Sequence, residues 1–144
     1  MTDRDVSERK WGRYEILYQG PTENGYLKVK RLILNPLSST SMQRHKFREE
    51  HFFRLLGEAV VQLADRRMMV ADGAFVARGA WHSIVNETEK PASLIEVQIG
   101  SVVSEDDIER ADSGGIQVPD SDDLIINPWV PTDELRKIDK HRKP

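Results

Sequence analysis

Short runs of alternating apolar and polar residues, separated by tight turns, constrain this chain more than any other feature. Residues 12–20 (GRYEILYQG) and 26–34 (YLKVKRLIL) alternate on either side of a Pro-, Asn- and Gly-containing turn. The pattern recurs along the chain as far as residues 93–100 (SLIEVQIG). Strands of this kind at this spacing predict an all-β sandwich or barrel. A length of 144 residues fits one domain with its own core.

The pattern changes after Gly100. Ser104 is a suitable N-cap and is followed by three acidic residues, which predicts a short helix over residues 104–110. From Asp112 the chain is rich in Gly, Asp and Pro, and residues 131–139 suit one further short helix. We therefore expect a single domain over residues 1–111 and a C-terminal extension over residues 112–144, partly irregular, with a short helix and an extended tail.

Composition narrows the function classes. The formal net charge is -3, with 38% hydrophobic and 31% charged residues, which favours neither a nucleic-acid partner nor a membrane protein. No apolar run approaches the roughly 20 residues of a membrane helix, and the N-terminus lacks the apolar core of a signal peptide. We expect a cytoplasmic protein. Because cysteine is absent, any metal must take nitrogen and oxygen ligands.

A polar cluster interrupts the strand pattern before residue 52. Gln43 and His45 are two residues apart, so on a strand they share a face. Glu50 can converge with them only if the chain turns or bulges within residues 46–49. His82 begins a later strand, and neighbouring strands lie close enough for all four side chains to meet. Such a set suits Zn, Mn, Fe, Co or Ni, although spacing alone leaves an ordinary surface or core cluster open.

The same residues resemble the motifs of the cupin superfamily. The first motif, G(x)5HxH(x)3,4E(x)6G, is similar to Leu37, Gln43, His45, Glu50 and Gly57, with Leu and Gln in place of the first Gly and His. The second motif is matched by Gly79, His82 and Asn86, with Ala77 where Pro is usual. The resemblance implies a jelly-roll barrel, also called a double-stranded β-helix.

A narrower resemblance covers about Lys10 to Arg110. The segments KWGRYEIL, YLKVKRLILNP, SMQRHKFREEHF, GAWHSIVNET and LIEVQIGSVVSEDDIER resemble, in order, the C-terminal domain of type II mannose-6-phosphate isomerases. This implies a divalent metal held by Gln43, His45, Glu50 and His82, and a homodimer. It also implies isomerisation of mannose 6-phosphate and fructose 6-phosphate, a sugar phosphate being bound by Lys30, Arg48 and Arg110. The catalytic base is not identified.

Some residues depart from that family. Lys46 and Phe47 stand where the family has histidines, which alters the mouth of the site. Arg54 shares the face of Glu50 by alternation, so it would lie inside the barrel beside an anionic partner unless a bulge intervenes. His51 should point away from Glu50 and serve a structural role. We expect no guanylyltransferase activity. Another small-molecule cupin metalloenzyme (an oxygenase or a different sugar isomerase) and a non-catalytic sugar-binding module stay open as alternatives.

Overall fold

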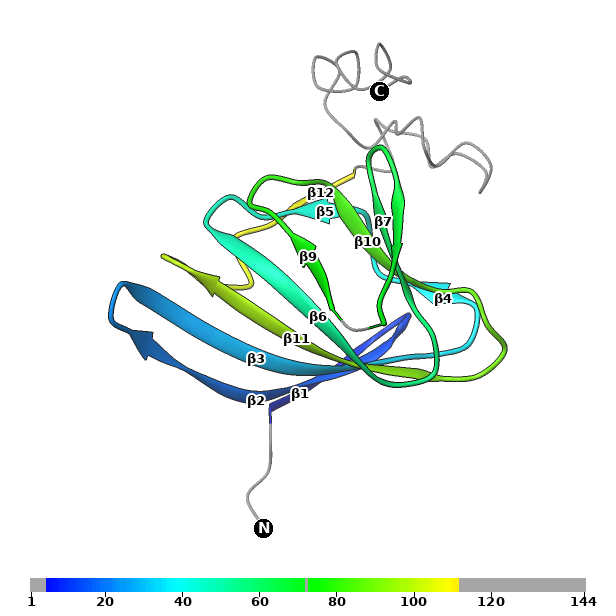
Figure 1. Cartoon of the computed structure of the whole chain (residues 1–144). Coiled ribbons are helices and arrows are strands. Elements are labelled where there is room, and N and C mark those ends of the chain that lie inside the picture. Colours follow the sequence, from blue (N-terminus) through cyan, green and yellow to red (C-terminus); the bar gives the residue numbers. More distant parts are fainter. Residues whose placement is uncertain (1–4, 72, 112–144) are drawn as a thin grey trace.

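All regular secondary structure in the part of the chain that the structure describes, residues 5–71 and 73–111 of a computed structural model, is β-strand (Figure 1). No helix in this part is long and apolar enough to cross a membrane. The strands are β1 Asp5–Arg9, β2 Gly12–Thr22, β3 Gly25–Leu34, β4 Ser38–Ser39, β5 Gln43–Arg44, β6 Arg48–Leu56, β7 Val60–Leu63, β8 Arg67–Met69, β9 Ala74–Val76, β10 His82–Asn86, β11 Ala92–Gly100 and β12 Glu109–Arg110.

The strands form two antiparallel sheets that face each other. One sheet has the order β1-β2-β3-β11-β6-β9, and the other has the order β12-β5-β10-β7-β8 with β4 paired to β10 (Figure 1). A single apolar core joins them, because Leu34 and Phe52 from the first sheet pack in one cluster with Val61 and Ile84 from the second. The all-β prediction is confirmed.

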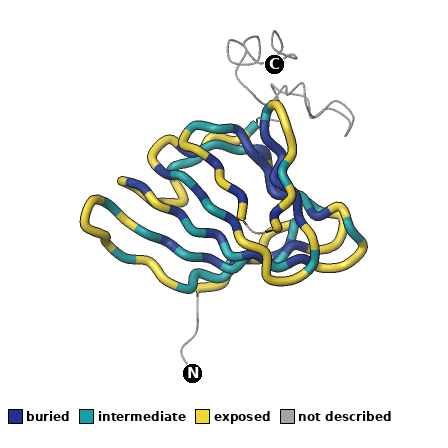
Figure 2. The backbone as a smooth tube through the Cα atoms, in the orientation of Figure 1, coloured by how far each residue is buried: buried dark blue, intermediate teal, exposed yellow. Residues whose placement is uncertain are grey.

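The interior of the barrel is apolar at one end and polar at the other. Along β3 the buried residues alternate with partly exposed ones, and they change from Lys28 and Lys30 to Leu32 and Leu34. Antiparallel pairing carries the same change across β11, where Glu96 lies opposite Lys30. Figure 2 shows these buried stretches alternating along both strands. The polar half of the interior is where the candidate site lies.

The helix predicted over residues 104–110 is absent, and this prediction is wrong. Residues 104–107 form a turn, in which the amide of Asp107 donates to the carbonyl of Ser104 at 3.1 Å, and β12 follows it. The acidic side chains that suit a helix N-terminus instead bind partners far away in the sequence: Glu105 binds Lys28, and Asp107 accepts from the amide of Lys46. The second predicted helix, over residues 131–139, lies outside the described residues, as does the whole C-terminal extension.

Candidate metal centre

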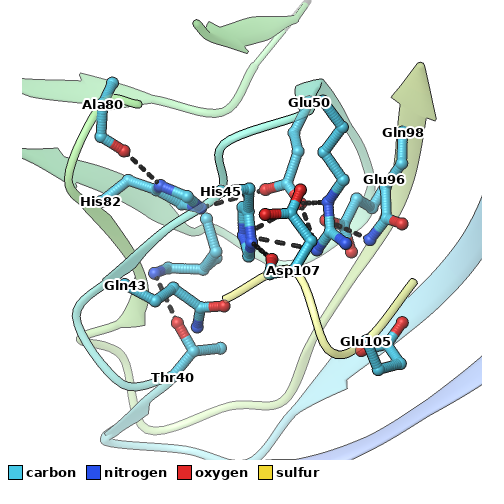
Figure 3. Close-up of polar contacts among 12 residues, drawn as sticks. Thr40, Gln43, His45, Glu50, Ala80, His82, Glu96, Gln98, Glu105 and Asp107 are labelled. Carbon is cyan, nitrogen blue, oxygen red and sulfur yellow. Dashed lines mark hydrogen bonds and ion pairs between the residues drawn. The ribbon is translucent and has the colours of Figure 1, made fainter. Parts of the chain in front are cut away.

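Three of the four predicted metal ligands meet at the polar end of the barrel. His45 follows β5, Glu50 lies on β6 and His82 begins β10, and all three are buried. One ligand atom from each lies within 4.8 Å of the other two (Figure 3). The expected turn between His45 and Glu50 is present as a bend at Lys46 and Phe47, and it lets Glu50 face back toward His45.

Backbone carbonyls set the protonation of both imidazoles. Nδ1 of His45 lies 2.8 Å from the carbonyl oxygen of Asp107, and Nδ1 of His82 lies 2.9 Å from that of Ala80. A carbonyl can only accept, so each Nδ1 carries the proton and, in the neutral ring, Nε2 carries a lone pair. Such carbonyl contacts are the usual orienting partners of metal-binding histidines.

The two lone pairs are directed at an anion. Nε2 of His82 is 3.0 Å from Oε1 of Glu50, and Nε2 of His45 is 3.3 Å from Oε2 of the same carboxylate. A lone pair and a carboxylate oxygen repel at this distance unless a proton or a cation lies between them. The residues therefore fit a divalent cation bound by two imidazole nitrogens and a carboxylate.

The ionisation of these groups also suits a metal. Burial is the main cause that lowers the pKa of His45 to about 4; the charge of Glu50 opposes it, and Arg48 and His82 lower the pKa further. Burial alone would raise the pKa of Glu50, but its contacts with the imidazoles of His82 and, next, His45 hold it well below its usual range. Metals bind the neutral imidazole and the ionised carboxylate, which are the forms favoured here.

The fourth predicted ligand, Gln43, lies beside the cluster. It pairs with His82 across β5 and β10, so the two side chains share a face, and it lines the same cavity. Its amide nitrogen donates to the carbonyl and hydroxyl oxygens of Ser41 at 3.1 and 3.2 Å. Coordination through the Gln43 amide oxygen stays a prediction.

The predicted substrate-binding residues line the same cavity, of about 330 Å³, but differ in their contacts. Arg48 is buried and already bound: Nε donates to Glu50 at 2.9 Å, Nη1 to the Ser104 carbonyl at 3.0 Å and Nη2 to Nε2 of His45 at 3.3 Å. Lys30 is buried, and its Nζ lies 2.7 Å from the carboxylate of Glu105, whereas Arg110 on β12 is exposed. Their role in binding substrate stays a prediction.

Glu96 was missed by the sequence reasoning. It is buried, lines the cavity and accepts a hydrogen bond from Gln98 at 3.1 Å. Burial, and then the charge of Glu50, raise its pKa to about 8, although Lys30 and Arg48 act in the opposite direction. Its carboxyl group is therefore protonated at neutral pH. The alternation Leu94, Glu96, Gln98 in the most strand-like segment could have revealed that it faces the interior.

The departures from the family lie away from this cavity. Arg54 is exposed and pairs with Glu58, so the expected cation inside the barrel is absent and this prediction is wrong. The register of β6 against β11 is continuous from Glu50 to Arg54 and shifts only beyond Arg54, so no bulge separates the two residues. Nε2 of His51 lies 2.8 Å from Oε2 of Glu49, and the His51 ring is tilted by 48° against the ring of Phe75, so His51 faces away from Glu50 as predicted.

The two residues that replace family histidines sit on the bend instead. Lys46 lines a separate surface groove with Asp106 and Asp107, and Phe47 is 42% exposed. Their amides donate to the carboxylate of Asp107, both at 2.9 Å. The altered mouth that the sequence suggested is thus outside the cavity that Glu50 and His82 line.

Comparison with known sequences identifies relatives over the described barrel. A family model described as mannose-6-phosphate isomerase C-terminal matches residues 2–113. Mannose-1-phosphate guanylyltransferase of Klebsiella pneumoniae is 35% identical over 104 residues, which are 71% of this chain and 21% of that protein. Alginate biosynthesis protein AlgA of Pseudomonas aeruginosa is 33% identical over 104 residues, with the same two shares. The chain spans about a fifth of the length of these relatives.

Solved structures agree with the fold. The capsular polysaccharide assembling protein CapF of Staphylococcus aureus has a TM-score of 0.66 at 14% identity, covering 76% of this chain and 34% of that one. Rru_A2000 of Rhodospirillum rubrum, described as a cupin-2 domain, has a TM-score of 0.65 at 11% identity, covering 89% and 90%. At these identities the likeness concerns the fold, and it confirms the predicted cupin barrel.

Proposed function

This chain belongs to the mannose-6-phosphate isomerase C-terminal family, and we propose that it is a metal-dependent aldose–ketose isomerase. Its substrates would be mannose 6-phosphate and fructose 6-phosphate, or a closely related pair of sugar phosphates. The observation that carries the proposal is the convergence of two imidazole Nε2 atoms on the ionised carboxylate of Glu50 at the wall of a cavity. The relatives named as guanylyltransferases are far longer than this chain, so their names leave the activity of this part open.

The charge of the cavity suits a sugar phosphate. Five cationic side chains line it, against three carboxyl groups, of which Glu96 is protonated at neutral pH. Its volume lies at the lower end of the roughly 300–1,000 Å³ typical of small-molecule pockets. Oε1 of Gln98 is buried and has no hydrogen-bond partner among the described residues, so it is available to accept from a sugar hydroxyl.

Aldose–ketose isomerisation moves one hydrogen between neighbouring carbons and one proton between their oxygens. A divalent metal held by His45, Glu50 and His82 would polarise those oxygens and stabilise the negative charge that develops on them. Glu96 holds a proton inside the cavity, so it is our candidate for donating a proton to one sugar oxygen and recovering it from the other. Arg48 holds the Glu50 carboxylate in position through its Nε hydrogen bond.

Metal content and isomerase activity, measured together, test this proposal. Protein purified without chelator should contain a stoichiometric transition metal and should form fructose 6-phosphate from mannose 6-phosphate. His82→Ala should lose both properties. His51→Ala is the matched control, since His51 lies outside the cavity, and it should keep both. Unchanged metal content in His82→Ala would refute the metal site, whereas bound metal without isomerisation would favour another cupin metalloenzyme.

One contact favours the sugar-binding module as a second candidate. The Arg48 guanidinium donates to Nε2 of His45 and lies 2.9 Å from Glu50, so an internal cation already satisfies part of the cluster. In a metal-free module this arrangement would be permanent. Mannose 6-phosphate binding by calorimetry, without bound metal and without turnover, would support that reading.

A further inference from the structure

One carboxylate oxygen, on Glu105, joins the two buried ammonium groups of Lys28 and Lys30, and of these residues Glu105 and Lys30 line the cavity. Oε2 of Glu105 lies 3.0 Å from Nζ of Lys28 and 2.7 Å from Nζ of Lys30. Each lysine is 4% exposed, whereas the Glu105 side chain is 44% exposed. Both lysines are on the inner face of β3, two residues apart, so their side chains run side by side.

The charge in this group does not balance. Buried charges are costly unless they are paired, and here two cations share one carboxylate. Nζ of Lys30 also lies 4.0 Å from the centre of the Tyr14 ring, which offers only a weak attraction. The pair of lysines is thus suited to an anion with more than one negative charge.

Glu105 behaves as a bound anion itself. Burial would raise its pKa, but the charge and hydrogen bond of Lys30, and then those of Lys28, lower the pKa to about 2. The carboxylate thus stays ionised at every pH at which the protein would be assayed. Glu105 lies on the turn at residues 104–107 and not on either sheet (Figure 3), and it reaches both lysines from there. A half-exposed side chain on a turn can leave its partners for solvent without disturbing the barrel.

Arg48 is a poorer anion site than these lysines, although the family resemblance named it for substrate binding. Its guanidinium already donates to Glu50, to the carbonyl of Ser104 and to His45. An incoming anion would have to break these bonds inside the barrel. At Lys28 and Lys30 it would have to replace only the Glu105 contact and the weak attraction of the Tyr14 ring.

We propose that Lys28 and Lys30 form the oxyanion subsite for the phosphate group of the ligand, and that Glu105 occupies this subsite until phosphate displaces it. The identification of the anion as a sugar phosphate rests on the proposed function. A phosphate oxygen can accept from both ammonium groups, as Oε2 of Glu105 does, and a phosphate dianion also balances both lysine charges. Glu105 is thus an internal competitor of the substrate.

Inorganic phosphate is the probe, and calorimetry on the chelator-dialysed full chain measures its binding without turnover. If Glu105 leaves the lysines free in about one molecule in ten, Glu105→Gln should bind phosphate about tenfold more tightly than the natural chain. The matched control is Glu109→Gln, which removes a carboxylate of the same segment that pairs with Arg44 at 2.6 Å, and it should leave the affinity unchanged. Adding Lys28→Met to Glu105→Gln should abolish the gain.

The outcomes separate this inference from the proposed function. Unchanged or weaker phosphate binding by Glu105→Gln overturns the competitor role, and a gain that survives Lys28→Met overturns the subsite. Circular dichroism at the titration temperature checks that each variant is folded, and the phosphate-induced rise in melting temperature should be larger for Glu105→Gln than for the natural chain. Because no metal or turnover is involved, failure of the isomerase assay leaves this result intact.

Discussion

Replacing Glu96 by glutamine tests the charge state of the polar interior. Glu96 is 6% exposed, and burial, with the nearby charge of Glu50, raises its pKa to about 8. In the unfolded chain a glutamate titrates at about pH 4.3. Between these two values the folded chain holds a proton that the unfolded chain has released, so the natural chain loses stability as pH rises through this window.

The size of the effect follows from the two pKa values. The loss is about 1.4 kcal/mol per pH unit and, over the whole window, on the order of 5 kcal/mol. Glutamine keeps the shape of the protonated acid and an oxygen to accept from Gln98, and it does not titrate. Glu96→Gln should therefore equal the natural chain in stability near pH 4 and exceed it increasingly up to pH 8, above which the difference stays constant.

Urea denaturation at a series of pH values, with chelator present, measures this difference. Glu58→Gln is the control, because Glu58 is an exposed carboxylate paired with Arg54, and its stability difference should vary little with pH. Parallel stability curves for Glu96→Gln and the natural chain would refute the reasoning, since they would show that Glu96 ionises normally in the folded chain.

Two further predictions concern residues of the cupin motifs. Leu37 has a φ of 54° and is 68% exposed, so Leu37→Gly should relieve roughly 1–2 kcal/mol of backbone strain. About half of that gain should be lost because glycine makes the unfolded chain freer, so chemical denaturation should show a net increase in stability. Leu56→Gly is the control, since Leu56 is an exposed leucine without positive φ, and it should destabilise the protein. Asn86 donates to three backbone carbonyls, including that of Lys90 at 2.8 Å, so Asn86→Ala should lower the stability by about 2–4 kcal/mol. The metal content of the folded variant should be unchanged. A loss of metal from that folded variant would contradict the structural role of Asn86.

The alternation of apolar and polar residues predicted most of the strands of the barrel. The structure places three of the four proposed ligands, His45, Glu50 and His82, close together. Period-two patterns report which face a side chain takes, and the bend at Lys46 and Phe47 was expected because Glu50 could not otherwise meet His45. The prediction of a helix over residues 104–110 was wrong because it depended on local sequence signals alone. Capping rules are local, whereas Glu105 and Asp107 are held by partners on β3 and on the bend.

The strand pattern could predict some of what the structure shows for Glu96 and Lys28, but not all of it. Their inward direction could be predicted from the neighbouring apolar residues of β11 and β3. What could not be predicted is the environment, because the pKa of Glu96 depends on Glu50, 46 positions away in the sequence, and the pairing of Lys28 depends on Glu105, 77 positions away. The partners and the pKa values of charged groups on separate strands therefore depend on how the two sheets pack, which the local sequence does not give.

The turn at residues 104–107 touches both halves of the site. Glu105 holds the two lysines, and two residues later the carbonyl of Asp107 holds Nδ1 of His45. If displacement of Glu105 by an anion also shifted the carbonyl of Asp107, binding of the anion and binding of a cation at His45 would be thermodynamically coupled. Coupling of this kind is reciprocal: whatever factor the anion imposes on the affinity for the cation, the cation imposes on the anion.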